Sequence, residues 1–178
     1  MPAAARQLIA RFRMEPIPHE GAWFAPTYRS SERVTVAGPA LEPGARSASS
    51  AIYCVQTRAD FSALHRLATD ELWHFYDGCP LELLLLHPDG RGETVVLGRD
   101  VAAGEHPQFL VPHGVWQAAR PLGGDEAWTF LGTTLAPGFE AADFAIGYRD
   151  ELQARYPALA AKIAEFTRPP HLHRPPTL

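Results

Sequence analysis

Eight short β-prone runs follow one another between residues 51 and 135, and this spacing constrains the fold more than any other feature of the chain. Turn residues separate the runs, and Asp77-Gly78 and Asp89-Gly90 are strong signals for tight turns. Short strands at even spacing are typical of an all-β sandwich or barrel. The sequence therefore predicts an all-β fold with a barrel core over residues 51–135. The runs are AIYCVQT, FSALHRL, ELWHFY, LELLLLH, ETVVLG, QFLVP, VWQAA and AWTFLGTTL.

Helical patterns flank this region. A short one covers residues 3–12, and after Phe144 the segments YRDELQARY and ALAAKIAEFT have helical periodicity. The Gly/Pro/Ser-rich stretch GPALEPGARSASS (38–50) is predicted to be a loop. A chain of 178 residues fits one domain, so we expect a single domain over residues 1–168 and a disordered Pro-rich tail over 169–178.

Charge and hydropathy exclude several classes of partner. The formal net charge is −4 and the pI is about 6.0, so the chain has no basic surface for nucleic acid or an anionic membrane. No apolar run approaches the ~20 residues of a membrane span. The N-terminal segment is interrupted by Arg6 and Arg11 and therefore lacks the apolar core of a signal peptide. We expect a cytoplasmic protein with reduced Cys54 and Cys79.

The stretch HRLATDELWHFYDG (65–78) concentrates ionisable side chains in the predicted barrel. Alternate side chains of a strand share a face, so Glu71, Trp73 and Phe75 point the same way. If His65 also points inward, the barrel encloses an imidazole and a carboxylate. Burial of such groups is costly and can shift their pKa values by several units. This pair is the first candidate for a functional site.

The spacing of this stretch resembles the first motif of the cupins, and PHGVWQ (112–117) resembles the second. Four blocks in the right order resemble the cupin 5 family, a branch of the RmlC-like cupins: EGAWFAPTYRS, HRLATDELWHFYDGCPLELLLL, PQFLVPHGVWQAA and LAPGFEAADFAIGYRDEL. The resemblance covers residues 8 to 166. It implies an RmlC-like jelly-roll β-barrel with short flanking helices, a pocket inside the barrel and a homodimer. The motif positions are His65, Leu67, Glu71, Gly78, Pro112, Gly114 and Gln117.

Three positions depart from the family pattern. Leu67 and Gln117 stand where cupins have histidine ligands, and Pro26 stands where the family has an acid. The departures predict no tightly bound metal, because an amide is a poor ligand for first-row metals. They also predict that the pocket lacks one acid. A weakly bound divalent metal remains the alternative, with ligands drawn from His65, Glu71, Gln117 and His74.

The resemblance implies a small polar ligand, sugar-like or nucleotide-linked, and a metal-independent epimerase or isomerase. His65 would be the base, Glu71 its orienting or second acid/base group, and Tyr28 an acid. The arginines could pair with phosphate or carboxylate. Two alternatives stay open: a metal-dependent oxygenase, isomerase or lyase, and a binding module without catalysis. The expected substrate-binding residues are Arg29, Arg66, Trp73, Phe75 and Gln117.

The run LELLLL favours a strand that is covered on both faces, since leucines occupy both sets of alternate positions. The outward pair, Leu84 and Leu86, would need a partner surface. Together with the family resemblance, this pattern predicts a homodimer.

Overall fold

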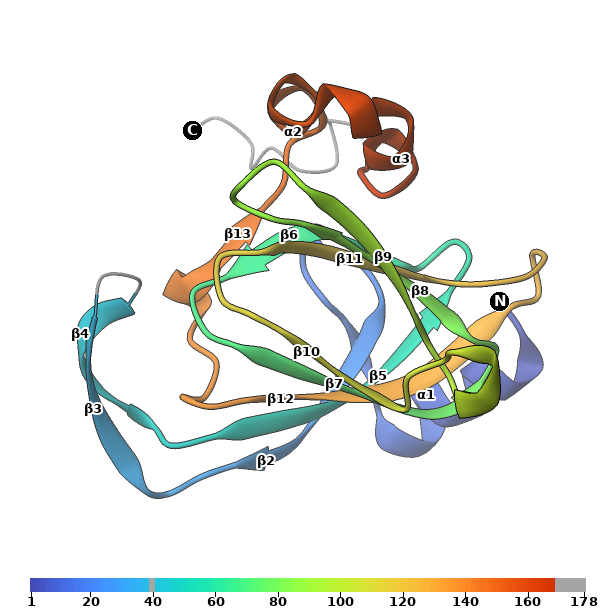
Figure 1. The fold of residues 1–178 in the computed structure, drawn as a ribbon. Coiled ribbons are helices and arrows are strands. Elements are labelled where there is room, and N and C mark those ends of the chain that lie inside the picture. Colours follow the sequence, from blue (N-terminus) through green and yellow to red (C-terminus); the bar gives the residue numbers. More distant parts are fainter. Residues whose placement is uncertain (39–40, 169–178) are drawn as a thin grey trace, which may run out of the picture.

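The computed structural model describes residues 1–38 and 41–168. Two sheets face each other and form a jelly-roll barrel (Figure 1). One has six strands in the order β1-β2-β5-β12-β7-β10, and the other has five in the order β13-β6-β11-β8-β9. The elements, with η for 3-10 helices, are α1 (Ala3–Phe12), β1 (Glu15–Pro16), β2 (Trp23–Arg29), β3 (Arg33–Gly38), β4 (Leu41–Ser47), β5 (Ser50–Thr57), β6 (Ser62–Leu67), β7 (Glu71–Gly78), β8 (Leu81–Leu86), β9 (Gly92–Leu97), η1 (Val101–Ala103), β10 (Gln108–Val111), β11 (Trp116–Pro121), β12 (Trp128–Leu135), η2 (Ala141–Asp143), β13 (Phe144–Ile146), α2 (Arg149–Arg155), η3 (Pro157–Leu159) and α3 (Ala160–Glu165).

All eight runs expected between residues 51 and 135 form strands, β5 to β12, and the all-β barrel with helices near both ends is confirmed. Their inward side chains make the core between the sheets, which includes Cys54, Trp73, Leu83 and Leu131. Strands also lie outside the expected range, because β2 pairs with β5 and β13 pairs with β6.

The C-terminal helices cover the outer face of the five-stranded sheet (Figure 1). Leu84 and Leu86 are buried there against Leu152, Ile163 and Phe166. The strand is thus covered on both faces as expected, but the surface that covers these two leucines belongs to the same chain and gives no argument for a homodimer. The alternation of a strand shows that both faces are apolar, but it does not show which segment covers them. The homodimer stays a prediction from the family resemblance.

Helix α1 lies against the outer face of the six-stranded sheet (Figure 1). Phe12 is stacked on Phe130 with ring centroids 5.7 Å apart and contacts Tyr53 at 5.0 Å. Such aromatic contacts add to the burial of apolar area. Within residues 1–38 and 41–168, no helix combines the length and apolar character that crossing a membrane requires.

The loop predicted over residues 38–50 is wrong for most of its length. Residues Leu41–Ser47 form β4, which pairs with β3, and β5 begins at Ser50. This hairpin projects away from the barrel beside β2 (Figure 1). Most of its described side chains are exposed, so there was no inward face to produce apolar alternation. Backbone pairing alone makes the strands. The predicted disordered tail, 169–178, lies outside the described residues.

A bulge interrupts the pairing of β7 with β12. Phe130 pairs with Asp77 and Leu131 pairs with Phe75, so Tyr76 has no opposite residue. Up to Phe75 the side chains of β7 alternate between the two faces as expected, and Trp73 is buried inside the barrel. The strand ends at Gly78, whose φ of 97° suits glycine and whose missing side chain leaves room for the backbone of β12.

Candidate functional site

The barrel encloses a cavity of about 560 Å³ between its two sheets. It reaches the surface beside Tyr28 and Phe139, which are 56% and 39% exposed. Most of the wall is apolar, as in many sites for small molecules. Among the apolar lining residues are Phe24, Ile52, Leu67, Leu131, Leu135 and Phe144.

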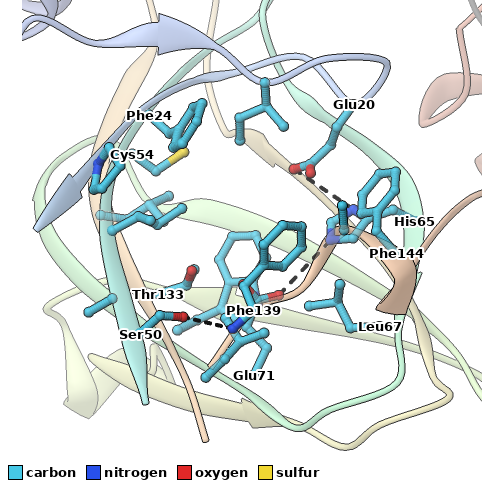
Figure 2. Close-up of a pocket in the computed structure, with 18 of the residues that line it drawn as sticks. Glu20, Phe24, Ser50, Cys54, His65, Leu67, Glu71, Thr133, Phe139 and Phe144 are labelled. Atoms are coloured by element: carbon cyan, nitrogen blue, oxygen red, sulfur yellow. Dashed lines mark hydrogen bonds and ion pairs between the residues drawn. The ribbon is translucent and has the colours of Figure 1, made fainter. Parts of the chain in front are cut away.

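His65 lies in the cavity wall between two carboxylates (Figure 2). Its Nδ1 is 3.8 Å from Glu20 Oε1, and its Nε2 is 4.0 Å from Glu71 Oε2. All three side chains are buried. Phe144 stacks on the imidazole with ring centroids 5.5 Å apart and holds its plane. The inward parity of β6 and β7 thus brings His65 and Glu71 to the same cavity.

The two carboxylates set the charge of His65. Burial of the ring disfavours the charged form, but the negative charge of Glu20 and the interaction with Glu71 outweigh it and raise the pKa of His65 to about 9. Burial also raises the pKa of Glu20, although His65 and a hydrogen bond from Ser62 Oγ at 2.5 Å offset part of that effect. At neutral pH His65 is therefore a cation with a proton to donate, which suits an acid better than the expected base.

The proton that can move is the one on Nε2. Nδ1 lies 2.9 Å from the Ala63 carbonyl oxygen and donates to it. Trp73 Nε1 can only donate and bonds Gln117 Oε1 at 2.9 Å, so Gln117 Nε2 must face Glu71 Oε2 at 2.5 Å and His65 Nε2 at 3.3 Å. The amide can donate to His65 only when Nε2 is deprotonated, whereas Glu71 stabilises the protonated form. Gln117 and Glu71 therefore support both states of Nε2.

The donor set does not fit the metal that many cupins bind. Gln117 Oε1, the atom that would ligate a cation, already accepts from Trp73, and Leu67 supplies no donor. His74 is outside the cavity lining and contacts Thr134 Oγ1 at 3.0 Å and Gln108 Nε2 at 3.1 Å. In the part of the chain that the structure describes, no three His, Cys, Asp or Glu side chains are arranged to hold a metal ion.

The other expected site residues divide between the cavity and its surroundings. Tyr28 and Arg29 line the mouth, where Arg29 pairs with Glu140 at 2.6 Å and donates to the Phe139 carbonyl at 2.9 Å. Arg66 is not in the lining; its guanidinium lies 4.7 Å from the ring of Trp116 on the outer side of β6. Phe75 is also outside the lining, although it packs against the inner core.

Pro26 lines the cavity and supplies no acid there, but Glu20 is a second carboxylate in the pocket that the sequence analysis did not identify. It comes from the connection between β1 and β2, which Arg168 holds by donating to the Glu20 carbonyl at 3.1 Å and the Phe61 carbonyl at 2.8 Å. No periodicity in the sequence identifies Glu20, because its position depends on contacts with distant residues.

Three further lining residues, Cys54, Gln56 and Thr133, were also missed. Strand alternation could have found them, since Cys54 and Gln56 share one face of β5 and Thr133 shares its face with Leu131. Burial, followed by the charges of Glu20 and Glu71, raises the pKa of the Cys54 thiol well above its usual value. A neutral thiol is a poor nucleophile, so covalent catalysis through Cys54 is disfavoured.

We expect His65 to titrate near pH 9 rather than near its ordinary value of 6.5. The stability that its protonation contributes is complete below pH 6.5 and is lost as the pH rises through about 9. Titration followed by NMR of ¹⁵N-labelled imidazole checks the midpoint. Glu71→Gln should move it toward 6.5, because one of the two stabilising charges is gone. A wild-type midpoint at or below 6.5 would contradict this assignment.

A jelly-roll barrel with a buried histidine and glutamate at the first-motif spacing defines a cupin, and the chain belongs to the Cupin superfamily (DUF985), whose family model matches residues 6–147. It is similar to the protein SO0799 of Shewanella oneidensis, with 32% identity and a TM-score of 0.81 over 95% of this chain and 99% of that one. Uncharacterized protein YML079W of Saccharomyces cerevisiae is 28% identical over 92% of this chain and 86% of its own.

The barrel also resembles that of oxalate decarboxylase from Bacillus subtilis in the solved structure of a mutant form. The TM-score is 0.50 at 13% identity, over 86% of this chain and 37% of that one. At this identity the likeness concerns the fold alone.

Proposed function

We propose that the chain binds a small molecule in the barrel and catalyses a metal-independent proton transfer on it, as an epimerase or isomerase does. The observation that carries the proposal is the pair of His65 Nε2 and Glu71, 4.0 Å apart, in the wall of an otherwise mostly apolar cavity. Weak solvation of a buried acid/base pair strengthens its interaction with a substrate.

Glu71 acts as the base and His65 as the acid. Glu71 takes a proton from a carbon beside a substrate carbonyl, and His65 gives its Nε2 proton to the carbonyl oxygen, which yields a neutral enol. Glu71 then returns a proton to the other face of the same carbon, which completes an epimerisation. Where that carbon carries a hydroxyl, Glu71 returns the proton to the former carbonyl carbon instead, which completes an isomerisation. In both cases the enol hydroxyl that becomes the product carbonyl gives its proton back to His65. No electron leaves or enters, so the reaction needs no redox cofactor. Glu20 acts through His65 by keeping the imidazole charged.

The remaining expected contacts take roles that follow from their places. Trp73 and Gln117 orient Glu71 and His65 through the hydrogen bonds of the amide. Tyr28 is more than half exposed at the mouth, so we assign it to the rim of the ligand site rather than to proton transfer. The acid/base pair lies on buried strands, whereas the mouth is open to solvent, and this difference in position supports the assignment of Tyr28 to the rim.

Deuterium exchange tests the proposal. Purified full-length protein in D₂O with excess EDTA is incubated with a panel of ketones, aldehydes and keto sugars, and loss of the α-proton signal is followed by ¹H NMR. Support would be exchange that EDTA leaves unchanged and that His65→Asn removes. Exchange that appears only with an added divalent metal would refute the metal-independent mechanism, as would no exchange with any compound.

A further inference from the structure

Two polar atoms in the cavity wall have no hydrogen-bond partner of ordinary geometry among the described residues: Gln56 Nε2, whose side chain lies beside the Cys54 thiol, and Thr133 Oγ1. Gln56 is fully buried and Thr133 is 4% exposed. Nearly all buried polar groups in proteins are paired, and an unpaired one costs free energy. Two such atoms facing one cavity indicate a ligand that pairs with them.

A backbone hydrogen bond shows which end of the Gln56 amide is without a partner among the described residues. The backbone N–H of Ser62 donates to Gln56 Oε1 at 3.4 Å, so the amide nitrogen is the end left without a partner. Thr133 lies in the middle of the six-stranded sheet, with Ile52 and Trp73 as its neighbours on the adjacent strands. Figure 2 shows its hydroxyl on the wall opposite His65.

The charges around the cavity exclude an anion. Glu20 and Glu71 both line it, and His65 between them is the cation that they share. At the mouth, the guanidinium of Arg29 is paired with Glu140. A carboxylate or phosphate would therefore enter beside two acids, where the cationic side chains of His65 and Arg29 already face carboxylates. An amide nitrogen and a hydroxyl instead match neutral oxygen atoms.

We propose that the cavity selects an electrically neutral ligand with an apolar body and an uncharged oxygen group that hydrogen-bonds with Gln56 Nε2, Thr133 Oγ1 or both. The inference rests on the proposed function for the reacting end of the ligand and goes beyond it by naming the ligand class. It replaces the nucleotide-linked ligand expected from the sequence with an uncharged one. Neither residue transfers a proton; both are specificity-determining.

Binding of three probes of similar size tests the proposal: acetophenone, benzoate and ethylbenzene, titrated calorimetrically into the full chain at neutral pH. We expect acetophenone to bind about tenfold more tightly than benzoate and several-fold more tightly than ethylbenzene. The double variant Gln56→Met/Thr133→Val should lose the preference for acetophenone over ethylbenzene, with ethylbenzene affinity within about twofold of wild type. Thr134→Val is the matched control, because its hydroxyl bonds His74 outside the cavity.

A second readout separates a binding role from a structural one. Thr133→Val removes a hydroxyl that has no hydrogen-bond partner in the described part of the chain, so the melting temperature of the ligand-free protein should stay the same or rise. A lower melting temperature would show that the hydroxyl serves the fold and would count against the proposal. Benzoate binding as tightly as acetophenone, or an acetophenone preference that survives the double variant, would overturn it.

The outcomes keep this proposal distinct from the catalytic one. Selective binding of acetophenone without deuterium exchange on any panel compound would refute proton transfer and leave the neutral ligand class supported. Exchange on a panel compound together with a preference for benzoate would support proton transfer and refute the neutral ligand class.

Discussion

Replacing His65 with asparagine should lower the rate of deuterium exchange by ~10²–10⁴-fold, which is the usual contribution of a positioned acid/base group. The variant removes the Nε2 proton that faces Glu71, while the asparagine amide can still donate toward the Ala63 carbonyl as Nδ1 does. The barrel should therefore keep its fold. The rate is measured by ¹H NMR on the panel compound that exchanges fastest, and the fold is checked by circular dichroism.

Two further variants test whether the loss of rate is specific to the proposed acid/base pair. Glu71→Gln keeps the shape of the side chain but removes its charge, so we expect a lower rate together with a lower midpoint for His65. His74→Asn is the matched control, because this histidine contacts Thr134 and Gln108 outside the cavity lining and should leave the rate unchanged. A folded His65→Asn protein that retains most of the wild-type rate would rule out His65 as the acid.

Replacing Asp143 with alanine should lower the free energy of unfolding by about 3–5 kcal/mol, because it removes a buried carboxylate with which the Arg46 guanidinium forms an ion pair. Their side chains are 7% and 4% exposed and form an ion pair between β4 and η2. Ala141 and Phe144, on either side of this contact in the chain, line the cavity. Loss of the pair should therefore also weaken acetophenone binding. Urea unfolding measures the stability change.

The double variant Arg46→Met/Asp143→Leu should recover most of that stability, since it removes both charges together. The exposed pair of Arg99 and Asp77, with side chains 68% and 61% exposed, supplies the control: Arg99→Ala should cost only about 0–1 kcal/mol. An Asp143→Ala protein as stable as wild type, or a double variant no more stable than the single one, would contradict this account of the buried pair.

The local sequence pattern was sufficient to predict the barrel core and part of the candidate site. Each of the eight β-prone runs could be recognised alone, because it is short, rich in β-prone residues and bounded by turn residues. The alternation of side chains along a strand placed His65, Glu71 and Trp73 on inward faces. It could also have placed Gln56 and Thr133 there, since the rule requires only the parity of a residue within its strand.

Contacts between distant segments decided the rest. Glu20 reaches His65 because Ser62 and Arg168 hold the connection that carries it, and Leu84 is buried because α2 and α3 fold back over β8. These contacts have no period in the sequence. The sequence by itself determined the strands of the barrel core over residues 51–135 and the parity of the side chains within them, because parity is a local property of the backbone. Only the tertiary structure decided that two carboxylates surround the imidazole and raise its pKa, because the electrostatic interaction depends on distance in space and not on separation along the chain.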